Sequence, residues 1–470
     1  MSRRMYTTND EAHNRNTDRS RGIRILLRLR DGLAGGIKRS CPGRTISTLT
    51  AVVVIALTFL PINLQAIERF PKPEFESGYT YLTPTRPLPR GMYFDYQDCV
   101  VLVLALAVTT YFALKRRSRK GIFAVMIFSL AYFGFWRRGC VCAVGSVQNV
   151  ACALGDHSYV IPFSVILFFL LPLITALLFG RMFCAGVCPL GAVQDIVIIR
   201  PLKLPGWINR ALGMIPYVYL GLAILFAVTA SSFIICRYDP FISLFRLSGP
   251  LAVILLGVCF LALGTVIARP YCRFLCPYGV LLNWMSRLSL RHVAITPEEC
   301  IQCRLCADSC PFDAIRMPTA RPGAAQMKTA RVRLIALIIL LPLLTIGGGW
   351  LVSRLAPTLA LVNPTVQLAE QIAREDAGRV EGPTLDSSAF RSSGTPTANL
   401  YADAEKIRKQ FFVGSWILGI FSGTVFGLTL IGLSVFRARK DFEPDRGTCL
   451  SCGRCFSYCP VKPGMTLKPE

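Results

Sequence analysis

The segment Cys300–Pro311, CIQCRLCADSCP, places four cysteines at the spacing C-x2-C-x2-C-x3-C and follows the fourth with proline. The segment Cys449–Pro460, CLSCGRCFSYCP, repeats this pattern near the end of the chain. The spacing is typical of bacterial proteins that bind [4Fe-4S] clusters, in which three cysteines of one run bind one cluster and the fourth reaches a second cluster. The two runs therefore predict one ferredoxin-like module that holds two clusters.

The same rule predicts which cysteines share a cluster, with the fourth cysteine of each run carried past the tight loop at the start of a helix. Each set takes three cysteines from one run and one from the other: Cys300, Cys303, Cys306 and Cys459; and Cys449, Cys452, Cys455 and Cys310. Zinc is a competing hypothesis, although zinc sites usually take paired C-x2-C units without a fourth Cys-Pro. Disulfides are disfavoured if the runs lie in the cytoplasm.

The rest of the chain is unusually apolar, because 53% of its 470 residues are hydrophobic. A soluble protein of this size would find such a composition hard to keep from water. Apolar stretches close to the ~20 residues that cross a bilayer occupy residues 47–66, 97–114, 121–136, 159–179, 212–235, 251–268, 334–353 and 411–436. We therefore predict an all-α polytopic membrane protein with about eight transmembrane helices and a ferredoxin-like module with two [4Fe-4S] clusters at its cytoplasmic face.

The formal net charge of +25 comes from basic residues that gather between alternate spans. In a membrane protein such residues indicate the cytoplasmic side, so we do not predict nucleic-acid binding. The rule predicts a multi-pass protein of the bacterial inner membrane with both termini in the cytoplasm. The predicted domains are a basic arm (1–46), a membrane domain (47–298), the first half of the module (299–330), a transmembrane hairpin with an outer loop at 354–410 (331–436), and the second half of the module (437–470).

Two shorter motifs share the form C-x3-CP, and each follows an apolar span: GRMFCAGVCPLGAVQD (180–195) and ARPYCRFLCPYGVLLN (268–283). Cysteines four apart on a helix share one face, and two such pairs brought together would offer four thiolates. The pairs predict a third iron–sulfur cluster or another metal at Cys184, Cys188, Cys272 and Cys276. Helix ends with buried cysteines are the alternative interpretation.

A degenerate third copy, RRGCVCAVGSVQNV (137–150), aligns Cys142 with Cys188 and Gln148 with Gln194. By the predicted topology it lies at the outer face, as does Cys236 in IICRYDPF. Cys140, Cys142 and Cys236 are therefore candidates for an outer redox or metal site, and a disulfide explains them equally well.

Other cofactors are not predicted. The chain has three histidines, His13, His157 and His292, and it lacks a C-x-x-C-H sequence, so haem is not expected. No glycine-rich dinucleotide or Walker motif is present.

The C-x3-CP motifs followed by CIQCRLCADSCP resemble the NapH/NosR-type membrane polyferredoxins, over about residues 120–315 and the C-terminal tail. The resemblance implies cluster-ligand roles for the eight cysteines of the two runs and a place in respiratory electron transfer. The NosR-like branch has a large outer domain with flavin attached at an S-G-A-T-like motif. This chain has SSGTPT (392–397) in a short outer segment, so FMN is not predicted.

The predicted function is single-electron transfer between a membrane donor or acceptor, with quinol as a candidate, and a partner protein. The chain would then be an electron-transfer component of an oxidoreductase system rather than a stand-alone enzyme. The main alternative is a copper or iron reductase, or a maturation or regulatory factor for an outer-face metalloenzyme. A module that only anchors a complex is the third hypothesis.

Overall fold

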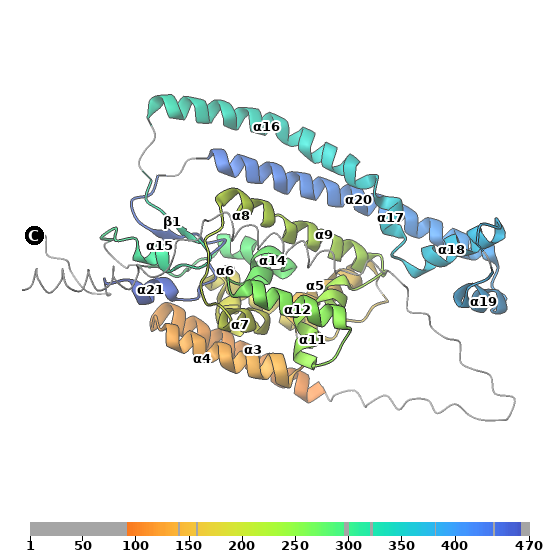
Figure 1. Cartoon of the computed structure of the whole chain (residues 1–470), viewed down its shortest axis with the longest axis horizontal. Coiled ribbons are helices and arrows are strands. Elements are labelled where there is room, and N and C mark those ends of the chain that lie inside the picture. Colours follow the sequence, from red (N-terminus) through yellow and green to blue (C-terminus); the bar gives the residue numbers. More distant parts are fainter. Residues whose placement is uncertain are drawn as a thin grey trace, which may run out of the picture. The chain divides into compact units, whose positions relative to one another are not determined.

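The structure, a computed structural model, describes residues 92–139, 142–156, 158–295, 300–319, 323–380, 382–435 and 438–461. The basic arm 1–46, the first expected span 47–66, Cys140 and His157 lie outside these residues. The described part of the chain is mostly helical and contains one two-stranded sheet. Figure 1 shows the order of these elements along the chain.

The elements before the first ferredoxin run are helices, three of them π-helical (η). In chain order they are α3 (Met92–Thr110), η1 (Tyr111–Lys115), α4 (Arg119–Ser129), η2 (Leu130–Trp136), α5 (Ala143–Gly155), α6 (Phe163–Phe179), η3 (Phe183–Val187), α7 (Pro189–Ile196), α8 (Gly206–Leu212), α9 (Ile215–Val228), α10 (Ile234–Tyr238), α11 (Pro240–Arg246), α12 (Leu251–Gly264), α13 (Pro270–Phe274) and α14 (Pro277–Arg287).

The remaining elements form the two halves of the module and the helices between them. They are α15 (Leu305–Ser309), β1 (Ile315–Arg316), α16 (Ala324–Ser353), α17 (Ala356–Ala360), α18 (Pro364–Asp376), α19 (Leu385–Ser392), α20 (Thr397–Ser434), β2 (Glu443–Pro444) and α21 (Arg454–Tyr458).

Four described helices are long and apolar enough to cross a membrane: 93–115, 206–228, 326–353 and 397–434. A fifth crossing is counted if α11 and α12, which meet at 105°, form one broken span. The expected spans at 121–136 and 159–179 are not among them, since the first is divided between α4 and η2 and α6 has only 17 residues. The chain is thus a multi-pass membrane protein, with four or five candidate crossings in the part that the structure describes.

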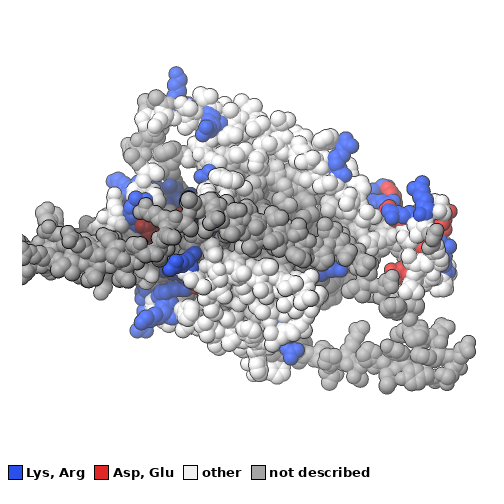
Figure 2. Space-filling model, viewed as in Figure 1, with Lys and Arg blue, Asp and Glu red and all other residues white. Residues whose placement is uncertain are grey.

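Charge is unevenly placed on the visible face. Figure 2 shows Lys and Arg gathered near α15, α21 and the start of α16, mixed acidic and basic residues over α18 and α19, and a largely uncharged surface between. Apolar side chains such as Ile339, Leu343 and Ile417 are exposed on the two long helices. An uncharged belt of this kind suits contact with lipid.

The hairpin α16–α20 is longer than the apolar stretches that predicted it. At a rise of 1.5 Å per residue, the 38 residues of α20 extend about 57 Å, well beyond the ~30 Å hydrocarbon core. The expected outer loop 354–410 is therefore largely helical, and α20 begins at Thr397 rather than near 411. Leu400, Ala404 and Phe411 explain this difference, because they form a continuous buried face that packs with Val366 and Ile372 of α18.

The two halves of the module meet through β1 and β2, which pair antiparallel with Ile315 opposite Pro444. The backbone N–H of Asp445 donates to the carbonyl of Ala314 at 2.8 Å, and Thr319 bridges to Arg439. In Figure 1, α15 and α21 lie beside this pairing. Segments that are separated by a membrane hairpin in the sequence thus form one unit.

Candidate metal centre

The two ferredoxin runs share one apolar core. Cys306, Cys310 and Cys452 are buried in it with Phe312 and Phe442. Other cysteines of the runs pack around these residues, half-buried: Cys300, Cys449, Cys455 and Cys459. Cys303 is exposed. The structure therefore brings thiols from both ends of the hairpin into one small volume.

One cavity gathers three cysteines of the first run with the last cysteine of the second. Its lining includes Cys300, Cys303, Cys306 and Cys459, closed by Ile295, Phe442 and Val461. Because Cys303 is exposed, this group of thiols lies at the surface of the module.

The other four cysteines form a deeper group. Burial raises the pKa of Cys449 to about 12, and the neighbouring thiolate charges of Cys452 and Cys310 add to the rise. Burial and the charges of Cys452, Cys449 and Cys310 also raise the pKa of Cys455. Iron binds the thiolate, so cluster assembly at these residues must release protons.

The fourth cysteine of each run does not start a helix, so that expectation is wrong. Cys310 follows the last residue of α15, and Cys459 follows the last residue of α21. The next residue in each case is proline, which disfavours helical backbone in the residue before it. Both cysteines consequently have extended backbone at the point where their helix ends.

The C-x3-CP cysteines also differ from the expected pairs on one helical face. Cys184 lies in η3, whereas Cys188 has extended backbone (φ −73°, ψ 116°) and caps α7 at Pro189. Cys272 lies in α13, and Cys276 (φ −60°, ψ 111°) caps α14 at Pro277. Proline favours the first position of a helix and extends the residue before it, so each motif is a break between two helices.

All four C-x3-CP cysteines nevertheless pack into a single core of the membrane domain. Cys184 also packs against the core of the ferredoxin module. The C-x3-CP group therefore adjoins the core of the ferredoxin module.

Gln194 connects the two C-x3-CP motifs. Its side-chain carbonyl accepts from the backbone N–H of Tyr271 at 3.0 Å, and its amide donates to the carbonyl of Leu190 at 2.8 Å and to Sγ of Cys272 at 3.3 Å. A hydrogen bond to sulfur holds a ligand thiolate in place and stabilises its negative charge.

A buried carboxylate joins the membrane domain to the module. Asp195 pairs with Arg119 at 2.5 Å, with Arg269 at 3.2 Å and with Arg454 of α21 at 3.3 Å. Burial alone would raise the pKa of Asp195, but Arg269, Arg119 and Arg454 together outweigh burial and hold that pKa well below its usual range.

Two of these arginines, and Arg181, donate hydrogen bonds to backbone carbonyls in or near the cysteine motifs. Arg269, which is fully buried, donates to the carbonyl of Cys184 at 2.5 Å, and Arg119 donates to the carbonyl of Cys452 at 2.9 Å. Arg181 donates to the carbonyls of Gly447 and Gly279. Buried positive charge beside several thiols fits a thiolate-bound cluster, whose ligands are anionic.

The cysteine pattern alone does not identify Asp195 and Arg269 as functional residues, although both lie within the two quoted C-x3-CP segments. The available signal was Asp195 itself, the one acidic residue in the segment 180–195.

Two of the three outer cysteines are described, and they are neighbours. Cys142 caps α5 and Cys236 lies in α10, where the side-chain carbonyl of Gln148 accepts from the backbone N–H groups of Ile235 (3.0 Å) and Cys236 (3.3 Å). Burial raises the pKa of Cys142 to about 12, followed by the charges of Asp239 and Cys236. Cys236 and Asp239 are thus close enough to Cys142 for their charges to act on its thiol.

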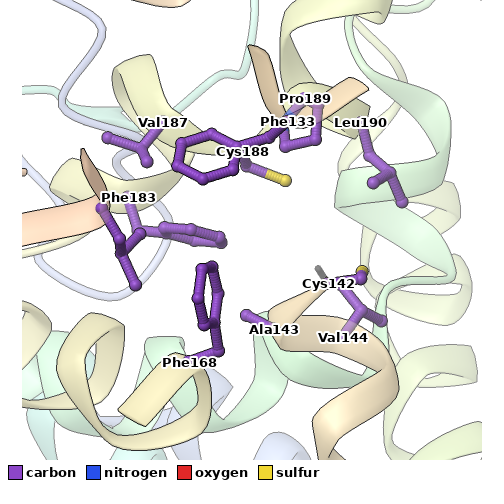
Figure 3. A pocket seen from close by; sticks show the side chains of 11 residues that line it. Phe133, Cys142, Ala143, Val144, Phe168, Phe183, Val187, Cys188, Pro189 and Leu190 are labelled. Atoms are coloured by element: carbon purple, nitrogen blue, oxygen red, sulfur yellow. The ribbon is translucent and has the colours of Figure 1, made fainter. Parts of the chain in front are cut away.

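Cys142 and Cys188 line one cavity, which Figure 3 shows together with the rings of Phe133, Phe168 and Phe183. Among the described residues, no three Cys, His, Asp or Glu side chains converge closely enough to hold a single metal ion. A cubane accepts a wider arrangement, because each of its four ligands binds a different iron.

Two families described as 4Fe-4S binding domains match the chain. One covers residues 161–214 and 248–296, which contain all four C-x3-CP cysteines, and the other covers residues 293–316, which contain the first ferredoxin run. No solved structure gives a significant match.

Three curated relatives are similar to part of this chain. YccM of Escherichia coli, named as an electron transport protein, is 28% identical over 30% of this chain and 43% of its own length. The regulatory protein NosR of Stutzerimonas stutzeri is 26% identical over 46% of this chain and 32% of its own length. Protein NirI of Paracoccus denitrificans is 27% identical over 62% of this chain and 46% of its own length. The matches thus span less than half of each relative.

Proposed function

We propose that this chain, a NapH/NosR-type membrane 4Fe-4S protein, passes single electrons between a partner protein at the ferredoxin module and a donor or acceptor in the membrane. The observation that carries the proposal is the order of the cysteine groups. They run from the surface of the module, through its interior, to a group packed inside the membrane domain.

Each group has a proposed role in this order. Cys300, Cys303, Cys306 and Cys459 would hold a surface cluster, where exposed Cys303 favours exchange with a partner protein. Cys449, Cys452, Cys455 and Cys310 would hold a deeper cluster. Cys184, Cys188, Cys272 and Cys276 would hold a third. When bound, each cluster supplies a site that gains or loses one electron.

The chain's own residues position these groups. Arg119, Arg269 and Arg454 hold the module against the membrane domain through Asp195. Gln194 orients Cys272 through a hydrogen bond to its Sγ. Arg269 lies close enough to Cys184, Cys272 and Cys452 to offset the negative charge of their thiolates. A membrane quinol is the candidate donor, and the positive end of the protein, with the module, is assigned to the cytoplasmic side of the bacterial inner membrane.

A second candidate function is metal reduction or delivery in the maturation or regulation of an outer-face metalloenzyme. The similarity to the regulatory protein NosR favours it. Copper-dependent reoxidation of the reduced protein would distinguish this function from quinol-linked transfer.

The deciding experiment measures iron and acid-labile sulfide per chain on anaerobically purified protein, together with a redox-titrated EPR spectrum. We expect about twelve irons or more, at least the content of three cubanes, and one signal that is lost in a Cys188→Ser, Cys276→Ser double variant. A Cys259→Ser variant, altered in α12 outside all proposed groups, is the matched control. About eight irons and no change in the double variant would confine the clusters to the module and overturn the membrane centre.

A further inference from the structure

The membrane domain repeats its C-x3-CP arrangement a second time, in a form that no matched family covers. In the first arrangement, Gln194 lies six residues after Cys188 and accepts from the backbone N–H of Tyr271, the residue before Cys272. In the second, Gln148 lies six residues after Cys142 and accepts from the N–H of Ile235, the residue before Cys236. The pair α5–α10 thus corresponds to the pair α7–α13.

This correspondence identifies the counterpart of Cys276. Cys276 has φ −60° and ψ 111° and precedes Pro277 at the start of α14. Asp239 has φ −68° and ψ 115° and precedes Pro240 at the start of α11. A carboxylate therefore occupies the position that a thiol occupies in the other arrangement, three residues after Cys236.

Asp239 has an unused ligand atom. The residue is 2% exposed, and its Oδ1 accepts from the N–H groups of Phe241 (2.9 Å) and Ile242 (3.3 Å). Its Oδ2 is buried and has no hydrogen-bond partner among the described residues. Buried carboxylate oxygens normally have a partner, since leaving one unpaired costs free energy, so this atom indicates a missing ligand.

Gln148 points to the same missing ligand. Its buried amide nitrogen has no partner within the described segments, whereas the corresponding nitrogen of Gln194 donates to Sγ of Cys272. Gly145 leaves little space beside the thiol, because a Cβ there would lie 3.1 Å from Sγ of Cys236. Cys142 in turn lines the cavity that Cys188 also lines.

We propose that Cys142, Cys236 and Asp239 bind a further iron–sulfur cluster with mixed thiolate and carboxylate ligation. A cluster is favoured over a single ion because the corresponding C-x3-CP group belongs to a 4Fe-4S binding domain match. The proposed binding of a cluster does not depend on the electron-transfer function. The role of this cluster as the next redox centre after the C-x3-CP group rests on the proposed function.

The test compares iron content and EPR spectra of the reduced full-length protein in five variants. Cys142→Ser and Asp239→Ala should lose the same signal and the same amount of iron. Asp239→Cys should retain the iron with a changed spectrum, because a thiolate replaces a carboxylate on one iron. Cys259→Ser should match the unaltered protein.

Unchanged iron in Cys142→Ser and Asp239→Ala, with an unchanged spectrum in Asp239→Cys, would overturn the proposal. If the loss variants fail to fold, the spectrum of Asp239→Cys decides. Cys188→Ser separates the two ideas: a signal that survives Cys188→Ser but not Cys142→Ser would support this site even if no C-x3-CP cluster exists.

Discussion

Among single residues, Asp195 links the module to the membrane domain through three ion pairs. One carboxylate is shared by Arg119, Arg269 and Arg454, which come from three distant parts of the chain. Arg269 is fully buried. Breaking such a buried pair leaves an uncompensated charge, which costs far more than breaking a surface pair.

Asp195→Asn should therefore destabilise the protein by about 3 to 5 kcal/mol. The measurement is thermal unfolding followed by loss of cluster absorbance. The matched control is Asp376→Asn, which breaks an exposed pair with Arg391 and should cost about 1 kcal/mol or less. Equal losses in both variants would show that Asp195 does not support the attachment.

The pH dependence of this cost follows from the lowered pKa of Asp195. A carboxyl group with a lowered pKa in the folded state contributes its full stabilisation above its unfolded pKa of about 3.9. That stabilisation is lost as the pH falls through the lower folded value. The difference in stability between Asp195→Asn and the unaltered protein should thus be the same at pH 6 and pH 8. A cost that falls steadily between these values would contradict the assignment.

Gln194→Ala should weaken the C-x3-CP site, because it removes the hydrogen bond to Sγ of Cys272. Losses of such supporting bonds typically reduce metal affinity about 10- to 100-fold. Iron retained after timed exposure to a chelator measures the effect. Gln371→Ala, on α18 far from the cysteines in the sequence, is the control. If both variants retain the same amount of iron, Gln194 does not position Cys272.

At the scale of elements, the hairpin α16–α20 brings the two ferredoxin runs together. Its helices meet backbone to backbone, because a Cβ on Gly348 would lie 2.6 Å from the carbonyl oxygen of Gly419. Added Cβ atoms on Gly419 and Gly423 would meet the backbone of α16 even more closely. Small residues four apart permit this kind of approach between membrane helices.

Gly419→Leu should separate α16 from α20 and reduce the amount of iron in the module, although no cysteine is altered. The control is Gly432→Leu on the same helix, where a Cβ meets nothing within 4 Å among the described residues. Iron per chain and the module's EPR signals measure the outcome. Full iron content in Gly419→Leu would show that the module assembles without close packing of the hairpin.

At the scale of the whole molecule, the two clusters should depend on each other. Each proposed ligand set takes one cysteine from the opposite run, and β1 and β2 join the halves. Deletion of residues 437–470 should therefore remove nearly all of the about eight irons of the module. Retention of about four irons would instead show that the first run holds a cluster alone. The matched comparison is the full-length protein with the single substitution Cys449→Ser.

The amino-acid sequence alone predicts the class of cofactor of this protein. Cysteine spacing is local, so the two ferredoxin runs and the C-x3-CP motifs are readable without coordinates, and the family matches agree with the 4Fe-4S prediction. Hydrophobicity likewise predicted a multi-pass helical protein. It could not fix the number of crossings, because the length and bending of a helix depend on what it packs against.

Which distant residues meet could be found only from the three-dimensional packing of the chain. Two of these contacts join segments that are far apart in the chain: the pairing of the two runs through β1 and β2, and the ion pairs of Asp195 with three arginines. The correspondence of Asp239 with Cys276 likewise became visible only from the backbone geometry. Sequence patterns carry little information about such contacts. Any buried charge needs a partner, but the packing of the chain determines which residue that partner is. The proline after Cys188 places that cysteine at a break between two helices, so the C-x3-CP cysteines do not share one helical face. They are nevertheless close together, because all four pack into one core.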